Sequence, residues 1–543
     1  MTLTCVDYSV NESIDLRTKE GFMTDDLPDA SPAALVEEAR SAGLDAAREV
    51  SVARQHSLGK LTARERVEML TDPGTFVELG GLVGPTRDTA FDGHVDAPAD
   101  GIVTGTAQID GRHVAVASFD FMVAGGSNGA SGSLKMERLV QIALDEGVPL
   151  VMILDGGGHR LQEGLDSWHF AWGFSLFAEM VRLSGWVPIV AVMVGPNFGG
   201  PTNFAALSDF VVMVRGISAM GIAGPALVKA ATNEDITKEE LGGADAQTRR
   251  GVADLAVESE EEAIDAVRVF LSYLPSNSSQ QSLLAECVDE HPDAAIIDSM
   301  VPANTRVAYD VRGVVTALAD DHSVFEIKPT HAANVVTAMG RLGGRAVGFI
   351  ANQPQHLGGA LDSAACEKAS HFVSMCDAFG LALVYLIDVP GFLGGSTAEE
   401  AQLGRRSGRM LFELGQATVP RFSVVMRKGY GAGYIAMNGG RSFSADLALA
   451  WPTAEISATS IDGALDIAYR RQIAEAADPV AERTELFSSF QRHISPLAAG
   501  RGFGVDDVVP ASRTRALLVD ALSRKPVRHP SRAPHKSHSI SPI

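Results

Sequence analysis

Four glycine-rich turns are the parts of this sequence that could do chemistry. They read DGGGHR (155–160) and GPNFGGP (195–201) in the first half of the chain, and DVPGF (388–392) and GYGAGY (429–434) in the second. Where a buried strand stops at glycine and a helix begins, backbone N–H groups are left unpaired, and a ligand can approach them closely because glycine has no Cβ. Two converging N–H groups in each half would form an oxyanion hole suited to a thioester enolate.

Other catalytic chemistry has weaker support in the sequence. The sequence contains no G-x-S-x-G nucleophile elbow, H-E-x-x-H motif, Walker lysine loop or Rossmann fingerprint after a first strand. No general base stands out by its spacing, and we expect no metal site. His159 follows the first glycine run and could act in acid–base chemistry or serve a structural role. The aromatic cluster at 166–174 could line a pocket or belong to the core.

An internal repeat positions the four turns. Two segments of the first half match two of the second at a constant offset of 233 residues, which places Val103 on Val336. The offset slips by one after Asp155, so that Gly199 falls on Gly431. A match of this length indicates that the chain is a duplicated domain. The matching segments are 101–118 with 334–351, and 135–155 with 368–388.

Each copy begins with a β-rich stretch and continues with amphipathic helices that alternate with short apolar runs. This order is typical of βα units around a largely parallel, buried sheet, so the predicted fold class is α/β. A separate amphipathic helix is predicted over 31–56, with Ser31 as N-cap and Pro32 at its first position. The polar segment 274–282 has the composition of a linker. The predicted divisions are a flexible leader (1–30), an N-terminal domain (31–285), a C-terminal domain (295–524) and a disordered tail (525–543).

Composition and charge argue against several classes of protein. The 543 residues are 46% hydrophobic, as in compact globular proteins, and carry a formal net charge of −22. Such an acidic chain is not expected to bind nucleic acid or an anionic membrane. The four cysteines form no C-x-x-C pair, and no stretch approaches the roughly 20 apolar residues of a membrane span. The first thirty residues do not have the pattern of a signal or transit peptide, so we expect a cytoplasmic protein.

Longer motifs give the chain a family resemblance. They include KLTARERVEMLTDPGTFVEL (60–79), TNEDITKEELGG (232–243), DVPGF (388–392) and ATVPRFSVVMRKGYGAGY (417–434). From about residue 45 to about residue 523 the chain resembles the carboxyltransferase (β) subunits of biotin-dependent acyl-CoA carboxylases, of the propionyl-CoA and acetyl-CoA carboxylase type. The resemblance implies a tandem duplication of two crotonase-like (ClpP/crotonase) domains and a homohexamer. It also implies active sites where the N-terminal domain of one protomer faces the C-terminal domain of another.

The same resemblance assigns roles to residues. The N-terminal copy would hold an acyl-CoA thioester, and the C-terminal copy would hold carboxybiotin. The backbone donors for the enolate oxygen would be Gly157, Gly158, Gly199 and Gly200. Those for the biotin ureido oxygen would be Gly391, Phe392, Ala432 and Gly433. The substrate pocket would include His159, Phe198, Tyr430 and Ile435. The candidates for contacts with the CoA phosphates are Lys60, Arg64 and Arg66, for which a solvated helix face is the alternative.

The resemblance also supplies a base. Carboxybiotin would give CO₂ and a biotin anion, the anion would remove the α-proton of the acyl-CoA, and the enolate would attack the trapped CO₂. The sequence shows no Ala/Val-Met-Lys-Met biotin attachment site and no ATP-grasp region. We therefore expect a separate biotin carboxylase/biotin carboxyl carrier (α) subunit as the partner that supplies carboxybiotin.

Two alternatives stay open at this point. The same site run in reverse would make the chain a subunit of a malonyl-type-CoA decarboxylase or transcarboxylase. The second alternative is a non-catalytic structural paralogue within a mixed carboxylase hexamer. It is motivated by three departures from the family motifs. Ser-Gly-Gly-Ala-Arg reads GGGHR at 156–160, with His159; Gly-Pro-Cys-Ala-Gly-Gly-Ala reads GPNFGGP, with Phe198; and the common Met-Gly reads Thr459-Ser460. These departures also leave the acyl group undecided.

Overall fold

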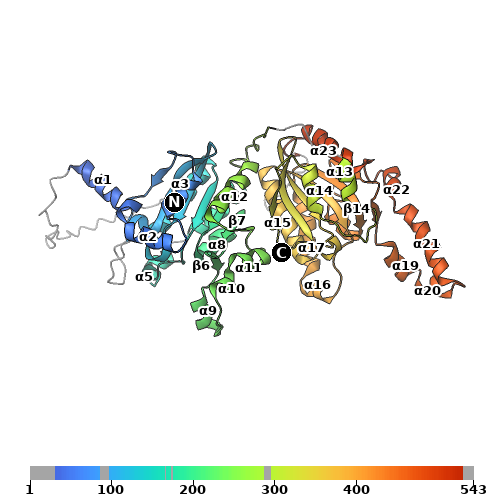
Figure 1. Cartoon of the computed structure of the whole chain (residues 1–543), viewed down its shortest axis with the longest axis horizontal. Coiled ribbons are helices and arrows are strands. Elements are labelled where there is room, and N and C mark those ends of the chain that lie inside the picture. The colour runs from blue at the N-terminus through green and yellow to red at the C-terminus, as the bar shows by residue number, and fades with distance from the viewer. Residues whose placement is uncertain (1–30, 86–96, 166, 173–174, 287–294, 530–543) are drawn as a thin grey trace, which may run out of the picture.

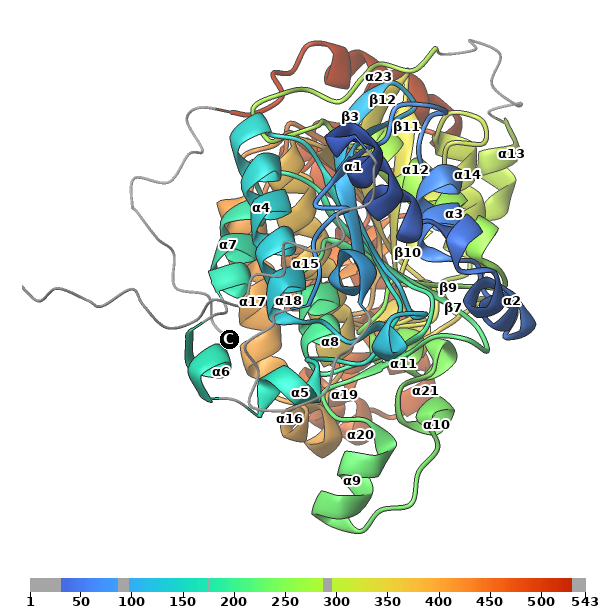
Figure 2. The same ribbon diagram turned by 90° about the vertical axis from the view of Figure 1, so that its left-hand side faces the viewer.

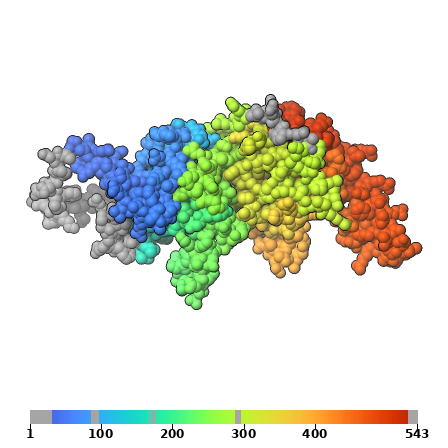
Figure 3. Space-filling model, viewed as in Figure 1, coloured from blue at the N-terminus to red at the C-terminus, as the bar shows by residue number. Residues whose placement is uncertain are grey.

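The computed structural model of the protein describes residues 31–85, 97–165, 167–172, 175–286 and 295–529. The predicted leader (1–30) and the part of the predicted tail beyond residue 529 lie outside these ranges. Figure 1 shows two bodies side by side along the long axis of the molecule, each built on a β-sheet with helices packed on it. Helix α9 projects from the first body and α16 from the second, and both projections stand out in the space-filling view (Figure 3).

The sheet of the first half has seven strands in the order β1-β2-β3-β4-β5-β7-β9. Strands β1, β2 and β3 pair antiparallel, and every pair from β3 to β9 is parallel. Two short strands, β6 and β8, form a separate parallel pair. The strands are β1 (Val77–Leu79), β2 (Ile102–Ile109), β3 (Arg112–Phe119), β4 (Leu150–Leu154), β5 (Ile189–Met193), β6 (Pro196–Phe198), β7 (Phe210–Val214), β8 (Ala219–Gly221) and β9 (Leu255–Val257).

Helices cover both faces of this sheet, which explains why β4, β5 and β7 are apolar and buried along their whole length. Helices α4 and α7 pack on one face, and α3 and α12 pack on the other. Figure 2 shows α4 and α7 on one side of β3 and α3 on the other. The helices of the first half are α1 (Pro32–Ala42), α2 (Glu49–Ser57), α3 (Ala63–Leu70), α4 (Ala130–Glu146), α5 (Leu161–Gly164), α6 (Ser167–Trp172), α7 (Ser175–Leu183), α8 (Gly200–Ala206), α9 (Pro225–Thr232), α10 (Lys238–Gly242), α11 (Ala244–Arg250) and α12 (Glu260–Tyr273).

The second half repeats the arrangement. Its main path is β10-β11-β12-β13-β14-β15-β17, with β16 paired to the end of β14. The strands are β10 (Phe325–Ile327), β11 (Val335–Leu342), β12 (Arg345–Asn352), β13 (Ala382–Val389), β14 (Arg421–Tyr430), β15 (Leu447–Ala450), β16 (Glu455–Ser457) and β17 (Asp507–Val508). The helices are α13 (Ala295–Met300), α14 (Val311–Leu318), α15 (Ser363–Phe379), α16 (Ser396–Glu400), α17 (Leu403–Gln416), α18 (Gly431–Ala436), α19 (Ile461–Ala468), α20 (Arg470–Glu475), α21 (Pro479–His493), α22 (Pro496–Arg501) and α23 (Thr514–Ser523).

Details of the two halves also repeat at the predicted offset. Gly147 and Gly380 end helices α4 and α15 in the left-handed conformation, at φ of 63° and 75°. Lys135 and Lys368 are buried on the same two helices, and the ammonium group of each donates to backbone carbonyls at the start of its sheet. The predicted tandem duplication is therefore confirmed.

The two halves share a hydrophobic core. The cluster beneath α3 and α12 of the first half continues without a break into the residues beneath α15 and α17 of the second. Phe210 stacks on Phe270 within the first half and lies 5.7 Å, between ring centroids, from Phe325 of the second. The Nζ of Lys328 lies 2.9 Å from Asp254 Oδ1 across the same junction. These contacts pack the two halves against each other through apolar side chains and an ion pair.

Two sequence predictions need correction at the ends of the chain. Ser31 caps the first helix as predicted, with Oγ accepting from the Ala34 N–H at 3.3 Å, but the predicted helix over 31–56 is interrupted between α1 and α2. The break begins at Gly43, which ends α1. The first residues of the predicted disordered tail are packed on the second half. Arg528 donates to the Ala378 carbonyl at 2.6 Å, and the His529 N–H donates to the Thr418 carbonyl at 2.8 Å.

Candidate active site

The four predicted turns lie at the carboxyl ends of adjacent parallel strands. In the first half, residues 155–160 follow β4 and residues 195–200 follow β5. In the second half, residues 388–392 overlap and follow the end of β13, and residues 429–434 lead from β14 into α18. Each half therefore places two turns side by side at one edge of its sheet.

The first turn needs glycine at two positions. Gly156 and Gly158 have φ of 155° and 61°, where L side chains are strained. A Cβ at Gly156 would collide with the Gly126 backbone, and one at Gly158 would lie 3.1 Å from the carbonyl oxygen of Phe198. That second neighbour belongs to the other turn, so the two turns touch at Gly158.

Hydrogen bonds distinguish the four predicted donors of the first half. The Gly157 N–H donates to Gly125 at 3.3 Å, and the Gly199 N–H donates to Gly221 at 2.9 Å. The Gly158 N–H has no hydrogen-bond partner within the ranges that the structure describes. Gly200 opens α8, where an N–H has no acceptor one turn back. One donor from each turn is thus available to a ligand.

The second half offers an equivalent pair. The Gly158 carbonyl accepts from Asn128 at 2.9 Å and the Gly391 carbonyl from Leu361 at 3.1 Å, so the offset of 233 continues into the turn and aligns Gly391 with Gly158. Ala432, the second residue of α18, aligns with Gly200 and also has no helical acceptor for its N–H.

The other two predicted donors of this half lie beside that pair. A Cβ on Gly433 would lie 2.8 Å from the Cα of Gly391, so these two turns also touch. Within the described part of the chain, the N–H groups of Gly391 and Phe392 have no backbone acceptor. The second half therefore keeps the predicted donors at its turns without a competing partner for Gly391.

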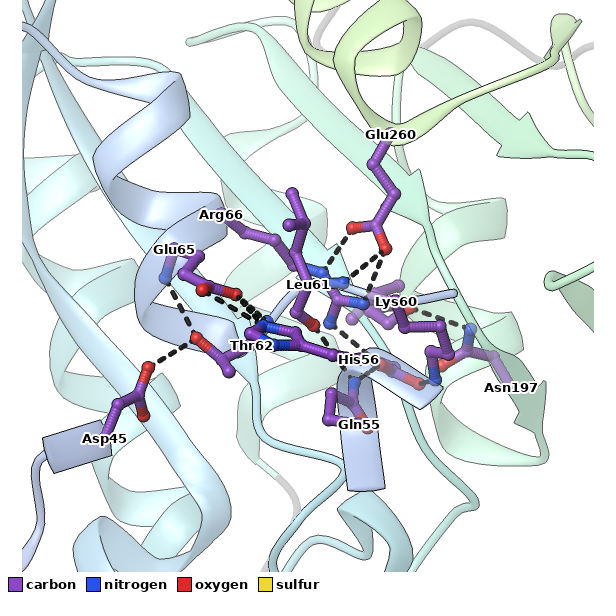
Figure 4. Close-up of polar contacts among 12 residues, drawn as sticks. Asp45, Gln55, His56, Lys60, Leu61, Thr62, Glu65, Arg66, Asn197 and Glu260 are labelled. Carbon is purple, nitrogen blue, oxygen red and sulfur yellow. Dashed lines mark hydrogen bonds and ion pairs between the residues drawn. The ribbon is translucent and has the colours of Figure 1, made fainter. Parts of the chain in front are cut away.

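Asp155, at the start of the first turn, is fully buried and paired with two cations. Its carboxylate binds Lys60 and lies 2.8 Å from Arg66 Nη1, and Gln55 Nε2 donates to it at 3.3 Å. Arg66 also binds Glu260, with Nε 2.5 Å from Oε2 (Figure 4). Burial lowers the pKa of Lys60, whereas for Arg66 the burial penalty is outweighed by Asp155 and Glu260, which raise its pKa. Two positive and two negative side chains thus neutralise one another beneath the turn.

Two of the three residues predicted to contact the CoA phosphates are buried in this cluster of ion pairs. Lys60 and Arg66 are 6% and 1% exposed, and their charged groups are held by carboxylates of the same chain. Arg64 forms a two-pronged pair with Glu78, at 2.8 and 3.0 Å. The solvated helix face is therefore wrong for Lys60 and Arg66, and the geometry gives a CoA phosphate no exposed edge of either group.

Asp388, the equivalent of Asp155, is also fully buried, but its cation comes from the neighbouring strand. Arg427 Nε donates to it at 2.9 Å, and the Lys428 N–H donates to it at 3.1 Å. Arg427 is in turn fixed by backbone carbonyls, including that of Val307 at 2.7 Å. Both turns are thus anchored by a neutralised aspartate.

Arg160 anchors the far end of the first turn. It is 1% exposed and its Nη1 lies 2.5 Å from Asp100 and 2.9 Å from Glu163. Those carboxylates accept from backbone N–H groups in the first turn of α4, Asp100 from Gly132 and Glu163 from Ala130, both at 2.6 Å. Burial raises the pKa of Asp100, against the opposing effect of Arg160. The network ties the turn to the helix that supports it.

The predicted pocket residues divide between the two halves. His159 is partly buried, and its ring lies 5.9 Å, edge to face, from Phe170, which is 53% exposed on α6. Phe198 lies over the end of β8 and the loop that follows, since a Cβ on Gly221 would be 3.3 Å from its ring and one on Gly224 3.4 Å from it. The sequence did not single out Phe170 from its aromatic cluster.

In the second half, Tyr430 is buried and its hydroxyl donates to Glu455. Burial, followed by Glu455, raises the pKa of Tyr430, which keeps this hydroxyl protonated. Ile435 is 42% exposed on α18. Glu455 was not predicted, because only the pairing of β16 with the end of β14 brings it to the tyrosine.

Two features are absent from the described residues. No cluster of three or more histidine, cysteine, aspartate or glutamate side chains there could hold a metal ion. No helix in the same residues has the length and apolar character needed to cross a membrane.

The fold and the paired donors define the class of protein. The chain belongs to the carboxyl transferase domain family, whose model matches residues 54–539, and biotin-dependent carboxyl transfer to and from acyl-CoA is the chemistry of this class. The family predicted from the sequence motifs is thus confirmed.

The chain is similar to two proteins of known activity and to one solved structure. The chain is 40% identical over 496 residues to the methylmalonyl-CoA carboxyltransferase 12S subunit of Propionibacterium freudenreichii subsp. shermanii, covering 90% of this chain and 93% of the relative. It is also 40% identical to the propionyl-CoA carboxylase beta chain of Saccharopolyspora erythraea, covering 92% and 93%. A crystal structure of transcarboxylase 12S, described as a hexamer assembly with methylmalonyl-CoA and methylmalonic acid bound, superimposes with a TM-score of 0.89 at 37% identity and covers 96% of this chain and 100% of that one.

Proposed function

We propose that this chain transfers the carboxyl group of carboxybiotin to the α-carbon of a short acyl-CoA. The observation that carries the proposal is the pair of available backbone N–H groups in each half, Gly158 with Gly200 and Gly391 with Ala432. An enolate oxygen needs two such donors, and each one typically contributes about 2.7–4 kcal/mol to transition-state stabilisation. The names of the relatives, which mention propionyl-, acetyl- and methylmalonyl-CoA, support a short acyl group.

In this proposal the first half binds the thioester. Gly158 and Gly200 donate to the thioester oxygen, which becomes negative when the α-proton leaves. Because the donors belong to the backbone of anchored turns, little reorganisation is needed as the charge develops. The anchors are Asp155 and Arg160, both buried in ion pairs.

The second half receives biotin, presented by a separate biotinylated α subunit. Gly391 and Ala432 fit a ureido group, because they offer two N–H donors to one carbonyl oxygen, and Tyr430 and Ile435 border that turn. When bound, carboxybiotin supplies CO₂ and the base for the α-proton. The chain's own residues orient the two reactants and exclude water around them.

The two half-sites of one chain lie on different bodies, so we propose that each active site forms between the first half of one protomer and the second half of another in a homohexamer. The similar transcarboxylase 12S, whose structure is described as a hexamer assembly, supports this arrangement. Light scattering of the purified protein tests the assembly, and a stable monomer would contradict it.

The reaction is tested by mixing the protein with its biotinylated partner, ATP and ¹⁴C-bicarbonate, and a panel of acetyl-, propionyl-, butyryl- and palmitoyl-CoA. We expect label in a short carboxyacyl-CoA. Absence of label with every acyl-CoA would contradict the proposal.

A reverse or transferring role is the second candidate. The chain is 37% identical to the methylmalonyl-CoA decarboxylase subunit alpha of Veillonella parvula, covering 91% of this chain and 95% of the relative. Release of CO₂ from methylmalonyl-CoA in the presence of free biotin, without incorporation of bicarbonate, would favour it. A non-catalytic role has less support, because the donors in both halves are intact.

A further inference from the structure

Asn197 is a fully buried residue that joins the two turns of the first half. Its Oδ1 accepts from the Gly156 N–H at 3.1 Å. Its Nδ2 donates to the carbonyls of Leu154 at 2.9 Å and Gly195 at 2.8 Å. Figure 4 shows Asn197 beside the Lys60 end of the ion-pair cluster. The amide thus holds the end of β4, the first turn and its own turn together.

Comparison with the second half shows which backbone pairing the Asn197 side chain replaces. There, Val389 and Gly429 pair directly as the last rung of the β13–β14 ladder. The equivalents of these residues in the first half are Gly156 and Asn197. The β4–β5 ladder, however, ends at the pair Leu154 and Met193, so Gly156 and Asn197 are not paired. The side chain of Asn197 takes the place of the missing backbone rung.

The bridge lies close to both donors. Gly156 is two residues before Gly158, and Asn197 is three residues before Gly200. Within the described residues, no backbone hydrogen bond joins 156–158 to 195–200. The relative position of the two available N–H groups therefore depends on the Asn197 amide and on van der Waals contact.

We propose that Asn197 is a positioning residue, whose amide sets the spacing between the Gly158 and Gly200 N–H groups. The inference rests on the proposed function, because the spacing matters to catalysis only if both groups bind one oxygen. A shift of about 1 Å in such a site can cost about 100-fold in rate. The binding of the CoA portion does not depend on this spacing.

The test compares Asn197→Ala with Asn277→Ala. Asn277 is a matched control, since it is 4% exposed, donates to the Gly147 carbonyl at 2.8 Å and accepts from the Ser279 N–H at 3.1 Å. It lies at the other end of α4, away from the turns. Both variants lose a buried amide, so both are expected to lower the melting temperature to a similar degree.

Only Asn197→Ala is expected to change the chemistry. We expect kcat for carboxyl transfer to fall by about 30–100-fold, with KM for the acyl-CoA within threefold of wild type, and KM for free biotin as acceptor unchanged. Asn197→Ser, which can still donate to one carbonyl, is expected to recover part of kcat and serves if the alanine variant does not fold. Equal kcat values for Asn197→Ala and Asn277→Ala would overturn the proposal.

Hydrogen–deuterium exchange separates this inference from the proposed function. Peptides covering 155–160 are expected to exchange at least tenfold faster in Asn197→Ala than in wild type or Asn277→Ala, whatever the activity. Unchanged exchange there would overturn the positioning role. If wild type transferred no carboxyl group while the exchange result held, the proposed function would fail and the bridge between the turns would stand.

Discussion

Gly195 and Arg427 occupy equivalent positions in the two halves, and they determine how each turn aspartate is neutralised. Arg427 binds Asp388 directly, with Nε and Nη2 each 2.9 Å from Oδ2. A side chain at Gly195 would collide with Asp155, and the space is filled instead by Lys60 and Arg66 from the α2–α3 region. One half therefore carries its counter-ion on the sheet, and the other half takes two counter-ions from the preceding α2–α3 region.

The Gly200 N–H can be removed with little disturbance of the fold. Proline is tolerated at the first position of a helix, and an added Cβ at Gly200 meets no atom within 4 Å. We expect Gly200→Pro to lower kcat by about 100–1,000-fold, the range measured when one oxyanion donor is lost. Gly200→Ala keeps the N–H and is expected to stay within threefold of wild type in steady-state kinetics. Similar losses in both variants would show that space, and not the donor, matters.

Ala432→Pro tests the biotin side in the same way. Ala432 lies in the first turn of α18, where proline costs no helical hydrogen bond. We expect slower transfer from methylmalonyl-CoA to free biotin, while the Kd for acyl-CoA measured by calorimetry stays at its wild-type value. Ala432→Ser keeps the N–H and is the control. A matching loss of acyl-CoA affinity would contradict the assignment of this half to biotin.

Arg66→Met is expected to destabilise the protein by about 3–5 kcal/mol, because it leaves Glu260 and part of the Asp155 charge buried without a partner. Arg64→Met removes a partly exposed pair with Glu78 and is expected to cost at most about 1 kcal/mol. Urea unfolding of both variants measures the difference. The double variant Arg66→Met/Glu260→Met is expected to recover part of the loss, and equal costs for the two single variants would argue against a buried cluster.

We expect His331 to make the junction between the halves sensitive to acid. Its Nδ1 lies 2.9 Å from the Arg249 carbonyl oxygen, and burial, followed by the Lys328 and Lys368 ammonium groups, lowers its pKa below the ordinary 6.5. The unfolded chain therefore binds a proton at this histidine before the folded chain does, and stability falls as the pH drops from 6.5 through the lowered pKa. In thermal unfolding between pH 7.5 and 5, we expect His331→Gln to lose less stability than wild type. Parallel pH profiles would contradict this.

The sequence predicted the duplication, the fold class and the location of the turns, because a repeat offset and strand–glycine–helix patterns are local signals. It could not tell Gly158 from Gly157, or Gly200 from Gly199. That distinction depends on the carbonyls of Gly125 and Gly221, which other segments of the chain bring to the turns.

The sequence also could not predict which cations of the α2–α3 region are buried. A solvated helix face was the alternative for Lys60, Arg64 and Arg66, yet two of them turn inward to a carboxylate almost a hundred residues further along the chain. Asn197 stood out only as part of a departure from the family motif, and its role could not be predicted because that role follows from a ladder rung that the first half lacks. Burial and long-range pairing, rather than residue type, decide these roles.

The core shared by the two halves has a consequence for protein engineering. If the gene were split between α12 and α13, each fragment would expose the aromatic faces of Phe210, Phe270 or Phe325. Because apolar burial contributes about 25 cal/mol per Å², such fragments would bind each other or aggregate rather than remain separate. The halves are therefore suited to a split-protein reporter, in which reassembly of the fragments restores the shared core.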